Sequence, residues 1–318
     1  MTGPPGAATA PLAPAARSVT ARAPAKINLS LRVGALRPDG YHTLATVFHA
    51  VHLDDLVTAT AVAGGEVTVE VADEHGVPVP GVPLDEANLA VRAALWLREA
   101  SGVPERGVHL AVRKSIPVAG GMAGGSADAA AALVACAELW GTDLDPLARV
   151  AAMLGSDVPF ALTGGCAIGT GRGEHLETLS AVPVPLHWVL ALAGTGLSTP
   201  AVYAALDELR GADQGAEPRI DLRLVTALER SLVGALGMLL DNDLEAAVLS
   251  LRPALADTLA AGRQAGARAG LVSGSGPTLA FLVDAHRAAT VARAVARQPG
   301  VADVRHVTGP APGAALVG

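Results

Sequence analysis

The clearest pattern of hydrophobic and polar positions lies near the N-terminus, in the segment KINLSLRV at residues 26–33. Apolar and polar residues alternate strictly there, which predicts a half-buried β-strand. The apolar face carries Ile27, Leu29, Leu31 and Val33. Lys26 and Asn28 therefore lie on the opposite, polar face of the same strand.

The rest of the first half predicts strands and helices in mixed order. Beyond a turn at residues 37–43, the pattern indicates strands up to His52, over 66–72 and over 108–116, a glycine-rich loop at 117–125, and helices over 88–100, 126–140 and 145–155. Asn88 is placed to cap the first of these helices, and Gly141 to end the second.

The second half has the same irregular order. The pattern predicts strands over 187–193 and 301–307, a strand-turn-strand unit over 269–284, and helices over 200–209, 221–236, 243–251, 253–265 and 286–297. Without regular βαβ alternation, we expect an α+β fold in two domains. The expected boundaries are a disordered tail at 1–17, an N-terminal domain at 18–180, a C-terminal domain at 181–310 and a disordered tail at 311–318.

Composition narrows the class of protein. The chain has 318 residues, is 51% hydrophobic and carries a net charge of −7, with only two lysines, Lys26 and Lys114, among 23 basic residues. No stretch of the sequence approaches the ~20 consecutive apolar residues of a membrane span. The negative net charge gives no overall positive potential that would attract nucleic acid. The first 17 residues lack the features of a signal peptide, so we expect a cytoplasmic protein with no nucleic-acid or membrane partner.

The segment from Pro117 to Ala132 carries the strongest chemical signal. Four glycines precede an alanine-rich helix that starts near Ser126, so backbone N–H groups and the positive helix end could bind an anion. The loop contains no lysine and therefore does not match a Walker A motif, and Met122 breaks the spacing of a dinucleotide-binding motif. A flexible connector before a helix remains the alternative.

Two ionisable residues suggest catalysis without establishing it. Asp157, in GSDVPF, stands before an apolar run where desolvation would suit a general base, but it could equally cap a helix. Lys26 could be an ordinary surface lysine, although arginine fills nearly every other basic position. Metal binding by His49 and His52 is disfavoured, because neighbours three apart on a strand face opposite sides. Cys136 and Cys166 fit no metal motif.

Seven segments, taken in order, resemble the GHMP kinases. They are PAKINLSLRV, RPDGYHTLATVFHAV, IPVAGGMAGGSADAAAAL, LGSDVPFALTGG, STPAVY, NDLE and LVSGSGPTLAF. The resemblance implies a ribosomal-protein-S5-like N-terminal domain that binds ATP and a ferredoxin-like C-terminal domain. Within the superfamily, PAKINL, DGYHTL and GSDVPF point to ATP-dependent phosphorylation of the 2-hydroxyl of 4-diphosphocytidyl-2-C-methyl-D-erythritol, in the non-mevalonate route to isoprenoid precursors.

The same resemblance implies roles for individual residues, with ATP and Mg²⁺ as cofactors. The implied catalytic pair is Lys26 and Asp157. The implied ATP-binding residues are Asn88, Leu89, Pro117, Val118, Ala119, Gly120, Gly121, Met122, Ala123, Gly124, Gly125, Ser126 and Ala127. The implied substrate-binding residues are Asn28, Tyr41, His42, Thr199 and Tyr203. Ala127 replaces a second serine that relatives often carry, so the Mg²⁺ ligands stay unassigned.

Three other functions are less consistent with the sequence. Another GHMP kinase, such as homoserine or mevalonate kinase, is disfavoured by DGYH and Tyr203. A catalytically dead nucleotide sensor would not need both Lys26 and Asp157. A dinucleotide-dependent oxidoreductase fails on glycine spacing. We expect a small-molecule enzyme that is a monomer or a weak homodimer.

Overall fold

A computed structural model describes residues 17–180, 182–211 and 216–318 of the chain. The first part is a sheet whose central order is β12-β1-β2-β4-β3, with β5 beside β2, β6 beside β5, and β8 beside β1. Its strands are β1 (Ser18–Leu36), β2 (His42–Val62), β3 (Val67–Asp73), β4 (Gly107–Lys114), β5 (Cys166–Gly171), β6 (His175–Thr178), β8 (Asp241–Asn242) and β12 (Ala315–Leu316).

The strand predicted at 26–33 is confirmed and is longer than the alternation alone indicated. It is the middle of β1, which forms an antiparallel hairpin with β2, with Lys26 opposite Ala50 and Asn28 opposite Phe48. Its polar face is not open to water: Lys26 is 7% exposed and Asn28 is 2% exposed. Loops from both halves of the chain cover that face, as described below.

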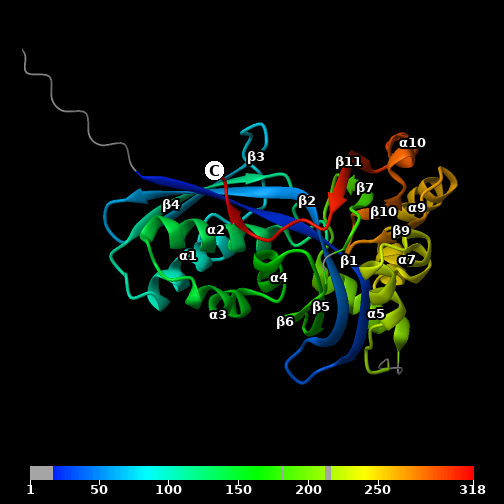
Figure 1. Cartoon of the computed structure of the whole chain (residues 1–318), viewed down its shortest axis with the longest axis horizontal. Coiled ribbons are helices and arrows are strands. Elements are labelled where there is room, and N and C mark those ends of the chain that lie inside the picture. Colours follow the sequence, from blue (N-terminus) through cyan, green and yellow to red (C-terminus); the bar gives the residue numbers. More distant parts are fainter. Residues whose placement is uncertain (1–16, 181, 212–215) are drawn as a thin grey trace, which may run out of the picture.

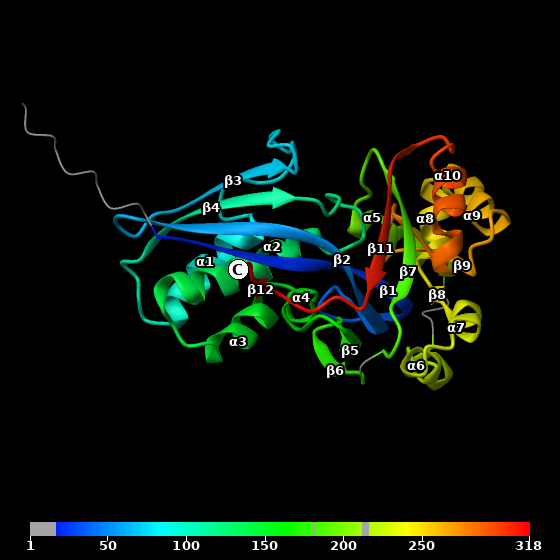
Figure 2. The ribbon, with the colours of Figure 1, turned by 45° about the horizontal axis from the view of Figure 1, so that its top comes forward.

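Four helices pack on one face of this sheet (Figures 1 and 2). They are α1 (Leu89–Ala100), α2 (Gly124–Trp140), α3 (Asp145–Leu154) and α4 (Val158–Thr163). Helix α2 is buried on almost all sides, because its small alanine side chains let the sheet, α1 and α3 approach its backbone closely. Asn88 caps α1 as predicted, since its side chain accepts a hydrogen bond from the N–H of Ala90 at 2.9 Å.

The second part is an antiparallel sheet of order β11-β7-β10-β9. Its strands are β7 (Leu186–Ala193), β9 (Ala269–Val272), β10 (Leu279–Val283) and β11 (Val301–Gly309). The accompanying helices are α5 (Thr199–Arg210), α6 (Leu222–Glu229), α7 (Val233–Leu239), α8 (Glu245–Leu251), α9 (Ala254–Gln264), the 3₁₀ turn η1 (Ala285–Arg287) and α10 (Ala288–Val295). The single helix expected over 221–236 is two helices, because Ser231 at φ 51° interrupts it.

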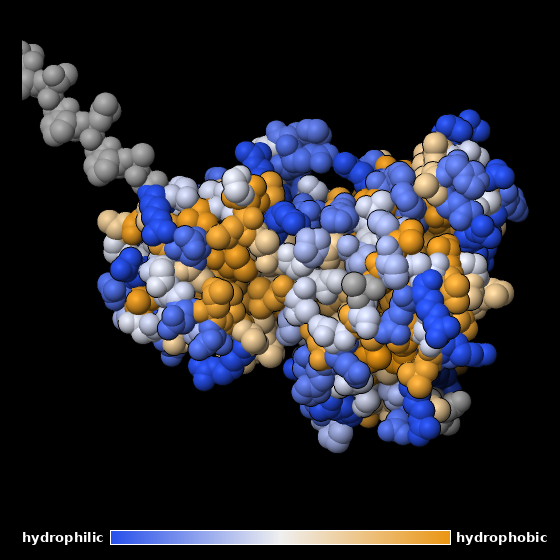
Figure 3. All heavy atoms as spheres, viewed as in Figure 1, coloured by the Kyte–Doolittle hydropathy of each residue, from blue (hydrophilic) through white to orange (hydrophobic). Residues whose placement is uncertain are grey.

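Strand β7 shows how the two parts join. Trp188 and Leu190 belong to the large core shared with the first sheet, whereas Val189 and Ala191 pack in the second core beneath α9 and α10. Both faces of β7 are thus buried over residues 188–192, which explains its apolar run from Trp188 onward. The α+β class is confirmed. The structure has two lobes, one built on each sheet, and Figure 3 shows hydrophilic and hydrophobic residues interspersed over the face that it presents.

The C-terminal segment contradicts the expected disordered tail at 311–318. Residues 315 and 316 form β12 and pair with β1, and Ala311 is 1% exposed. Backbone hydrogen bonds join Ala311 to Ala50 at 3.0 Å and Ala314 to Ala161 at 2.9 Å. Glycine and alanine, which suggested disorder, are needed for this close packing: a Cβ on Gly313 would collide with the backbone of Leu162.

The expected domain boundary between residues 180 and 181 separates the two lobes only in part. Strands β8 and β12 come from the second half of the chain but belong to the first sheet. Most of the expected N-terminal tail, residues 1–16, lies outside the described residues. Among the described helices, none combines the length and the apolar character needed to cross a bilayer.

Candidate active site

A cleft of about 930 Å³ lies where the glycine-rich loop, the β1–β2 hairpin, the start of α4 and the start of α5 meet. Many of the residues singled out from the sequence line it: Lys26, Asn28, Tyr41, His42, Pro117, Ala119, Gly120, Gly121, Ala123, Gly124, Gly125, Asp157, Thr199 and Tyr203. The others do not line it: Asn88, Leu89, Val118, Met122, Ser126 and Ala127. The site is thus assembled from segments more than 170 residues apart in the sequence.

Lys26 and Asp157 face each other in this cleft. The Lys26 Nζ atom is 3.8 Å from Oδ2 of Asp157. Burial lowers the pKa of Lys26, and the charge of Asp157 partly opposes that shift. Asp157 occupies the N-cap position of α4 but its side chain makes no capping hydrogen bond. The carboxylate is therefore directed to the cleft and the lysine, and helix capping does not explain it.

A chain of buried polar groups fixes the position of the Lys26 ammonium. Lys26 donates to Oδ1 of Asn28 at 2.6 Å, Asn28 donates to Oγ1 of Thr46 at 2.8 Å, and Thr46 donates to the carbonyl of Ser30 at 2.7 Å. Thr46 was not predicted as a site residue, although it lies in the segment RPDGYHTLATVFHAV, because only the pairing of β2 with β1 brings it to Asn28. Each buried donor in this chain has an acceptor, so the geometry is rigid.

The glycine-rich loop is held against the second lobe. Ser273 Oγ donates to the carbonyl of Gly121 at 3.2 Å, and the N–H of Thr278 donates to the carbonyl of Gly120 at 3.4 Å. Gly121 has φ 77°, and a Cβ there would lie 2.7 Å from the nitrogen of Gly276. Only glycine fits at this contact between the two loops.

Helix α2 begins directly after this loop, with Ala123 in the left-handed conformation at φ 60°. No side chain caps the helix, so the N–H groups of its first turn lack intrahelical partners, as an anion site requires. Met122 is fully buried, and its carbonyl accepts from the backbone N–H of Lys26 at 3.2 Å. Met122 therefore anchors the loop to β1, whereas the neighbouring glycines line the cleft.

Asn88 and Leu89 stand behind the loop. The Asn88 side chain accepts from Ala90 and donates to the carbonyl of Pro83 at 2.8 Å, so both of its polar groups are engaged with backbone. Leu89 lies beside Gly125, where a Cβ would be 3.7 Å from the leucine Cδ1. In this structure Asn88 shapes the helix start rather than facing the cleft.

At the other end of the cleft, His42 and Tyr203 form a stacked pair with ring centroids 5.2 Å apart. Nδ1 of His42 lies 2.9 Å from the carbonyl of Gly34, and Nε2 lies 3.3 Å from Asp207. Burial, together with the charge of Asp157, raises the pKa of Tyr203, so its hydroxyl stays protonated. This wall offers a flat aromatic surface whose edge carries polar groups.

Tyr41 and Thr199 complete this wall. Tyr41 is 55% exposed, and the guanidinium of Arg172 lies over its ring at 5.1 Å. Thr199 shares a hydrogen bond of 2.8 Å with Ser275 of the SGSGP turn. The substrate-side residues therefore come from the hairpin, from α5 and from a turn of the second lobe.

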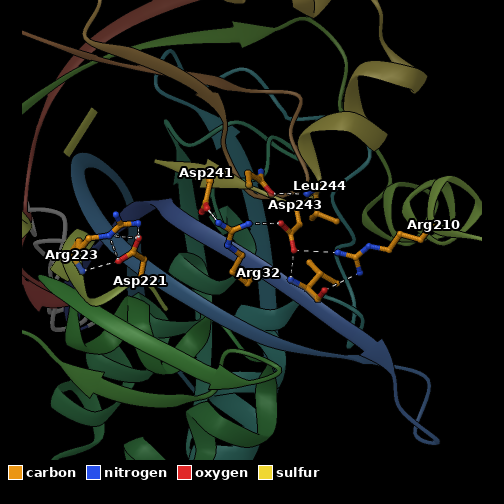
Figure 4. A network of polar contacts seen from close by, with 9 residues as sticks. Arg32, Arg210, Asp221, Arg223, Asp241, Asp243 and Leu244 are labelled. Carbon is orange, nitrogen blue, oxygen red and sulfur yellow. Dashed lines mark hydrogen bonds and ion pairs between the residues drawn. The ribbon is translucent and has the colours of Figure 1, made fainter. Parts of the chain in front are cut away.

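Helix α5, which carries Thr199 and Tyr203, is tied to β1 by ion pairs (Figure 4). The carboxylate of Asp243 accepts hydrogen bonds from Arg32 at 3.0 Å and from Arg210 at 3.2 Å. Arg210 also donates to the carbonyl of Val33 at 2.8 Å. Arg210 is the last residue of α5. The network fixes the far end of the helix that forms the aromatic wall.

Behind the glycine loop lies a buried cluster that sequence reasoning missed. Lys114 donates to Asp55 and, at 2.7 Å, to Asp128. Oδ1 of Asp55 accepts the N–H groups of Ser115 at 2.6 Å and Ile116 at 2.8 Å, where the chain enters the loop. The only sequence signal was the rarity of lysine. The three charges lie 14 and 59 residues apart and meet only in the fold.

Within the described residues, no group of three or more His, Cys, Asp or Glu side chains converges to form a metal site. His49 is buried, with Nδ1 3.1 Å from the Cys166 sulfur, and His52 is exposed, so the two do not form a site. Cys136 and Cys166 are both free and buried.

Comparison with known proteins places the chain among kinases. The model of the GHMP kinases N terminal domain matches residues 88–165, and that of the GHMP kinases C terminal matches residues 224–301. The chain is 53% identical over 305 residues to 4-diphosphocytidyl-2-C-methyl-D-erythritol kinase of Streptomyces coelicolor, a match covering 94% of this chain and 99% of that one. A kinase of the same name from Kineococcus radiotolerans is 56% identical, with 88% and 86% covered.

Solved structures agree with the sequence comparison. A crystal structure of 4-(cytidine 5'-diphospho)-2C-methyl-D-erythritol kinase superposes with a TM-score of 0.73 at 32% identity, covering 91% of this chain and 98% of that one. Homoserine kinase from Cytophaga hutchinsonii, at 21% identity and a TM-score of 0.73, shares the fold. This chain belongs to the GHMP kinase family, in the branch formed by the 4-diphosphocytidyl-2-C-methyl-D-erythritol kinases.

Proposed function

We propose that this protein transfers the γ-phosphoryl group of ATP to the 2-hydroxyl of 4-diphosphocytidyl-2-C-methyl-D-erythritol, in the non-mevalonate route to isoprenoid precursors. The relatives of the same branch carry this substrate in their names. The observation that carries the proposal is the Lys26–Asp157 pair, 3.8 Å apart, in the same cleft as the glycine-rich loop.

In the proposed reaction, Asp157 orients the acceptor hydroxyl and accepts its proton, while Lys26 balances charge beside it. Phosphoryl transfer has a loose transition state, so positioned charges matter more than covalent chemistry. The hydrogen bond from Lys26 to Asn28 holds the ammonium in place before substrate arrives. A positioned base of this kind contributes about 10²- to 10⁴-fold in rate.

The nucleotide phosphates are proposed to lie on the glycine-rich loop from Pro117 to Ala127, with the adenine towards Asn88 and Leu89. The uncapped start of α2 supports this placement, since its free N–H groups attract anions. Mg²⁺ usually binds through one or two protein oxygens together with phosphates and water. The partly exposed carboxylate of Asp157 lines the cleft and suits that mode. It would hold the ion, which would neutralise charge on the phosphates.

The cytidyl group is proposed to bind at the aromatic wall. A pyrimidine stacks on an aromatic face, and the His42–Tyr203 pair and the exposed ring of Tyr41 provide such faces. Asn28 and Thr199 also line the cleft and would add polar contacts to the acceptor. These aromatic groups favour a cytidyl acceptor over homoserine or mevalonate, which have no ring to stack.

An acceptor panel tests the substrate. ATP consumption would be measured with the cytidyl-methylerythritol, homoserine, mevalonate and galactose as separate acceptors. We expect turnover with the first compound. Turnover only with one of the other three would show a GHMP kinase of different specificity, and ATP binding without turnover of any acceptor would favour a nucleotide sensor.

Asp157→Asn tests the mechanism. We expect a loss of turnover of about 10²-fold or more, because the amide cannot accept the proton, with ATP binding largely retained. The measurements are kcat and, by calorimetry, the Kd for ATP. Near-normal turnover in this variant would remove Asp157 from the base role.

The location, oligomeric state and partners of the enzyme are also proposed from the sequence. We propose that the enzyme works in the cytoplasm as a monomer or weak homodimer, with small molecules as its partners. The net charge of −7 supports the absence of a nucleic-acid partner. Light scattering over a range of protein concentrations would determine the oligomeric state.

A further inference from the structure

The cleft is lined by few cationic side chains for a site that is proposed to hold a triphosphate. Among the described residues they are Lys26, Arg92 and Arg172. The glycine-rich loop itself contains no lysine or arginine. A polyphosphate carries several negative charges, and a hydrogen bond from a cationic side chain to phosphate is stronger than one from a neutral donor.

Two of these cations are already engaged. Lys26 contacts Asn28 and Asp157 at the acceptor end of the cleft. Arg172 pairs with Glu174 at 3.4 Å and lies over the ring of Tyr41. Both stand on the side where the acceptor is proposed to bind, which leaves Arg92 for the nucleotide side.

Arg92 is held in position and yet has no anionic partner among the residues that the structure describes. It lies on α1, and its guanidinium carbon is 4.6 Å from the centre of the Trp96 ring, one turn further along the helix. Within the described part of the chain its side chain forms no ion pair and no hydrogen bond. A guanidinium stacked on an aromatic ring keeps its N–H groups free at the edge, so it is preorganised to bind an anion.

The neighbourhood places Arg92 beside the anion cradle. It lines the cleft together with Gly124 and Gly125, the first residues of α2. Leu89 lies three residues earlier on the same helix and therefore on the same face. Its Cδ1 atom would be 3.7 Å from a Cβ placed on Gly125. The guanidinium and the first residues of α2 thus line the same cleft, and Leu89 places this face of α1 next to Gly125.

We propose that Arg92 binds the phosphate groups of the nucleotide, with Trp96 as the platform that holds its guanidinium, and so replaces the lysine that the loop lacks. The proposal rests on the proposed use of ATP. It does not depend on which acceptor the enzyme phosphorylates. Arg92 is assigned to nucleotide binding, with no role in proton transfer.

Calorimetry with ADP and with adenosine, in the absence of acceptor, tests the assignment. For Arg92→Gln we expect the Kd for ADP to rise about tenfold to 100-fold, the range for a lost hydrogen bond to a charged group. Adenosine, which has no phosphate, should bind the variant as it binds the wild type. Arg92→Lys should recover part of the ADP affinity, because the charge returns without the planar fork.

The salt dependence of ADP binding separates charge from structure. The affinity of the wild type should fall more steeply with salt than that of Arg92→Gln, because one phosphate contact is missing in the variant. Arg98→Gln is the matched control. This arginine is on the same helix but contacts the carbonyl of Gly65, away from the cleft, so its removal should leave ADP binding unchanged.

Three results would overturn the assignment. The first is wild-type affinity for ADP in Arg92→Gln. The second is an equal loss of ADP and adenosine binding, which would mean a contact with the base or damage to α1. The third is an unchanged salt dependence. If the wild-type protein itself bound no ADP, the proposed function would fail as well, so the two failures are distinguishable.

Discussion

The two lysines of the chain occupy opposite electrostatic environments. Lys26 has one carboxylate neighbour at 3.8 Å, and burial lowers its pKa. Lys114 is equally buried, but Asp128 and Asp55 both contact it, and they raise its pKa although burial alone would lower it. Lys26 thus lies beside the proposed base, whereas Lys114 is held behind the glycine-rich loop by two carboxylates.

The buried cluster contains two carboxyl groups, Asp55 and Asp128, for the single ammonium of Lys114, and a pH dependence of stability follows. Burial, reinforced by the charge of Asp55 and opposed by Lys114, raises the pKa of Asp128 to about 8. Between the unfolded pKa near 3.8 and this value, the folded state holds a proton that the unfolded state has lost. The free energy of unfolding should therefore fall as pH rises through this window, by at most about 1.4 kcal/mol per pH unit.

Asp128→Asn is the variant that isolates this effect. The amide cannot ionise, and it leaves Lys114 paired with Asp55 alone. We expect the unfolding free energy of the variant, from urea titrations at about pH 5, 6, 7 and 8, to change less with pH than that of the wild type. Parallel curves for the two proteins would show that Asp128 is ionised in the folded state across this range.

At the scale of elements, the glycine-rich loop and the SGSGP turn act as one unit. The loop leads from β4 to α2 and the turn joins β9 to β10, so their contact connects the two lobes. The turn also holds Thr199 through Ser275, and Asn242 in β8 donates to the carbonyls of Val272 and Gly274 at 2.8 Å. Separating loop and turn would move both walls of the cleft.

Gly121→Ala tests this contact. Its Cβ would collide with the carbonyl of Ser273, and its φ of 77° is unfavourable for alanine. We expect a loss of at least about 1–3 kcal/mol in unfolding free energy and a higher KM for ATP. Gly125→Ala is the control: its nearest neighbour would be Leu89 Cδ1 at 3.7 Å, so stability should be kept or slightly raised. Equal stability of the two variants would contradict this view of the contact.

At the scale of the whole molecule, the C-terminal segment returns from the second lobe and binds the first. Gly165 donates to the carbonyl of Ala311 at 2.7 Å, and Val317 donates to that of Thr20 at 2.9 Å. The same segment packs against α4, whose first residue follows Asp157. The position of the proposed base therefore depends on residues more than 150 positions later in the chain.

Deleting residues 311–318 tests that dependence. The deletion removes the four backbone hydrogen bonds that Ala50, Ala161, Gly165 and Thr20 form with this segment, so we expect a loss of about 2–6 kcal/mol in unfolding free energy. We also expect kcat to fall, because α4 loses its support. Removal of Gly318 alone, an exposed residue, is the control. A truncated enzyme with normal stability and kcat would restore the view of this segment as a passive tail.

Local patterns predicted much of the fold. Strict alternation placed Lys26 and Asn28 on one strand face, and they are hydrogen bonded there. The order of glycines and alanines located the loop before α2, and Asn88 was identified as a helix cap. These features depend on residues close together in the chain, where steric and hydrogen-bonding preferences act directly.

The sequence by itself determined the α+β class, most helices and strands, the glycine-rich loop and, through resemblance, the family. Only the tertiary structure decided that Lys26 meets Asp157, that Asp55 and Asp128 enclose Lys114, and that the final residues form a strand instead of a disordered tail. The physical reason is the same in each case. Such contacts join residues far apart in sequence, and their energy comes from burial and charge that exist only after the two lobes have packed together.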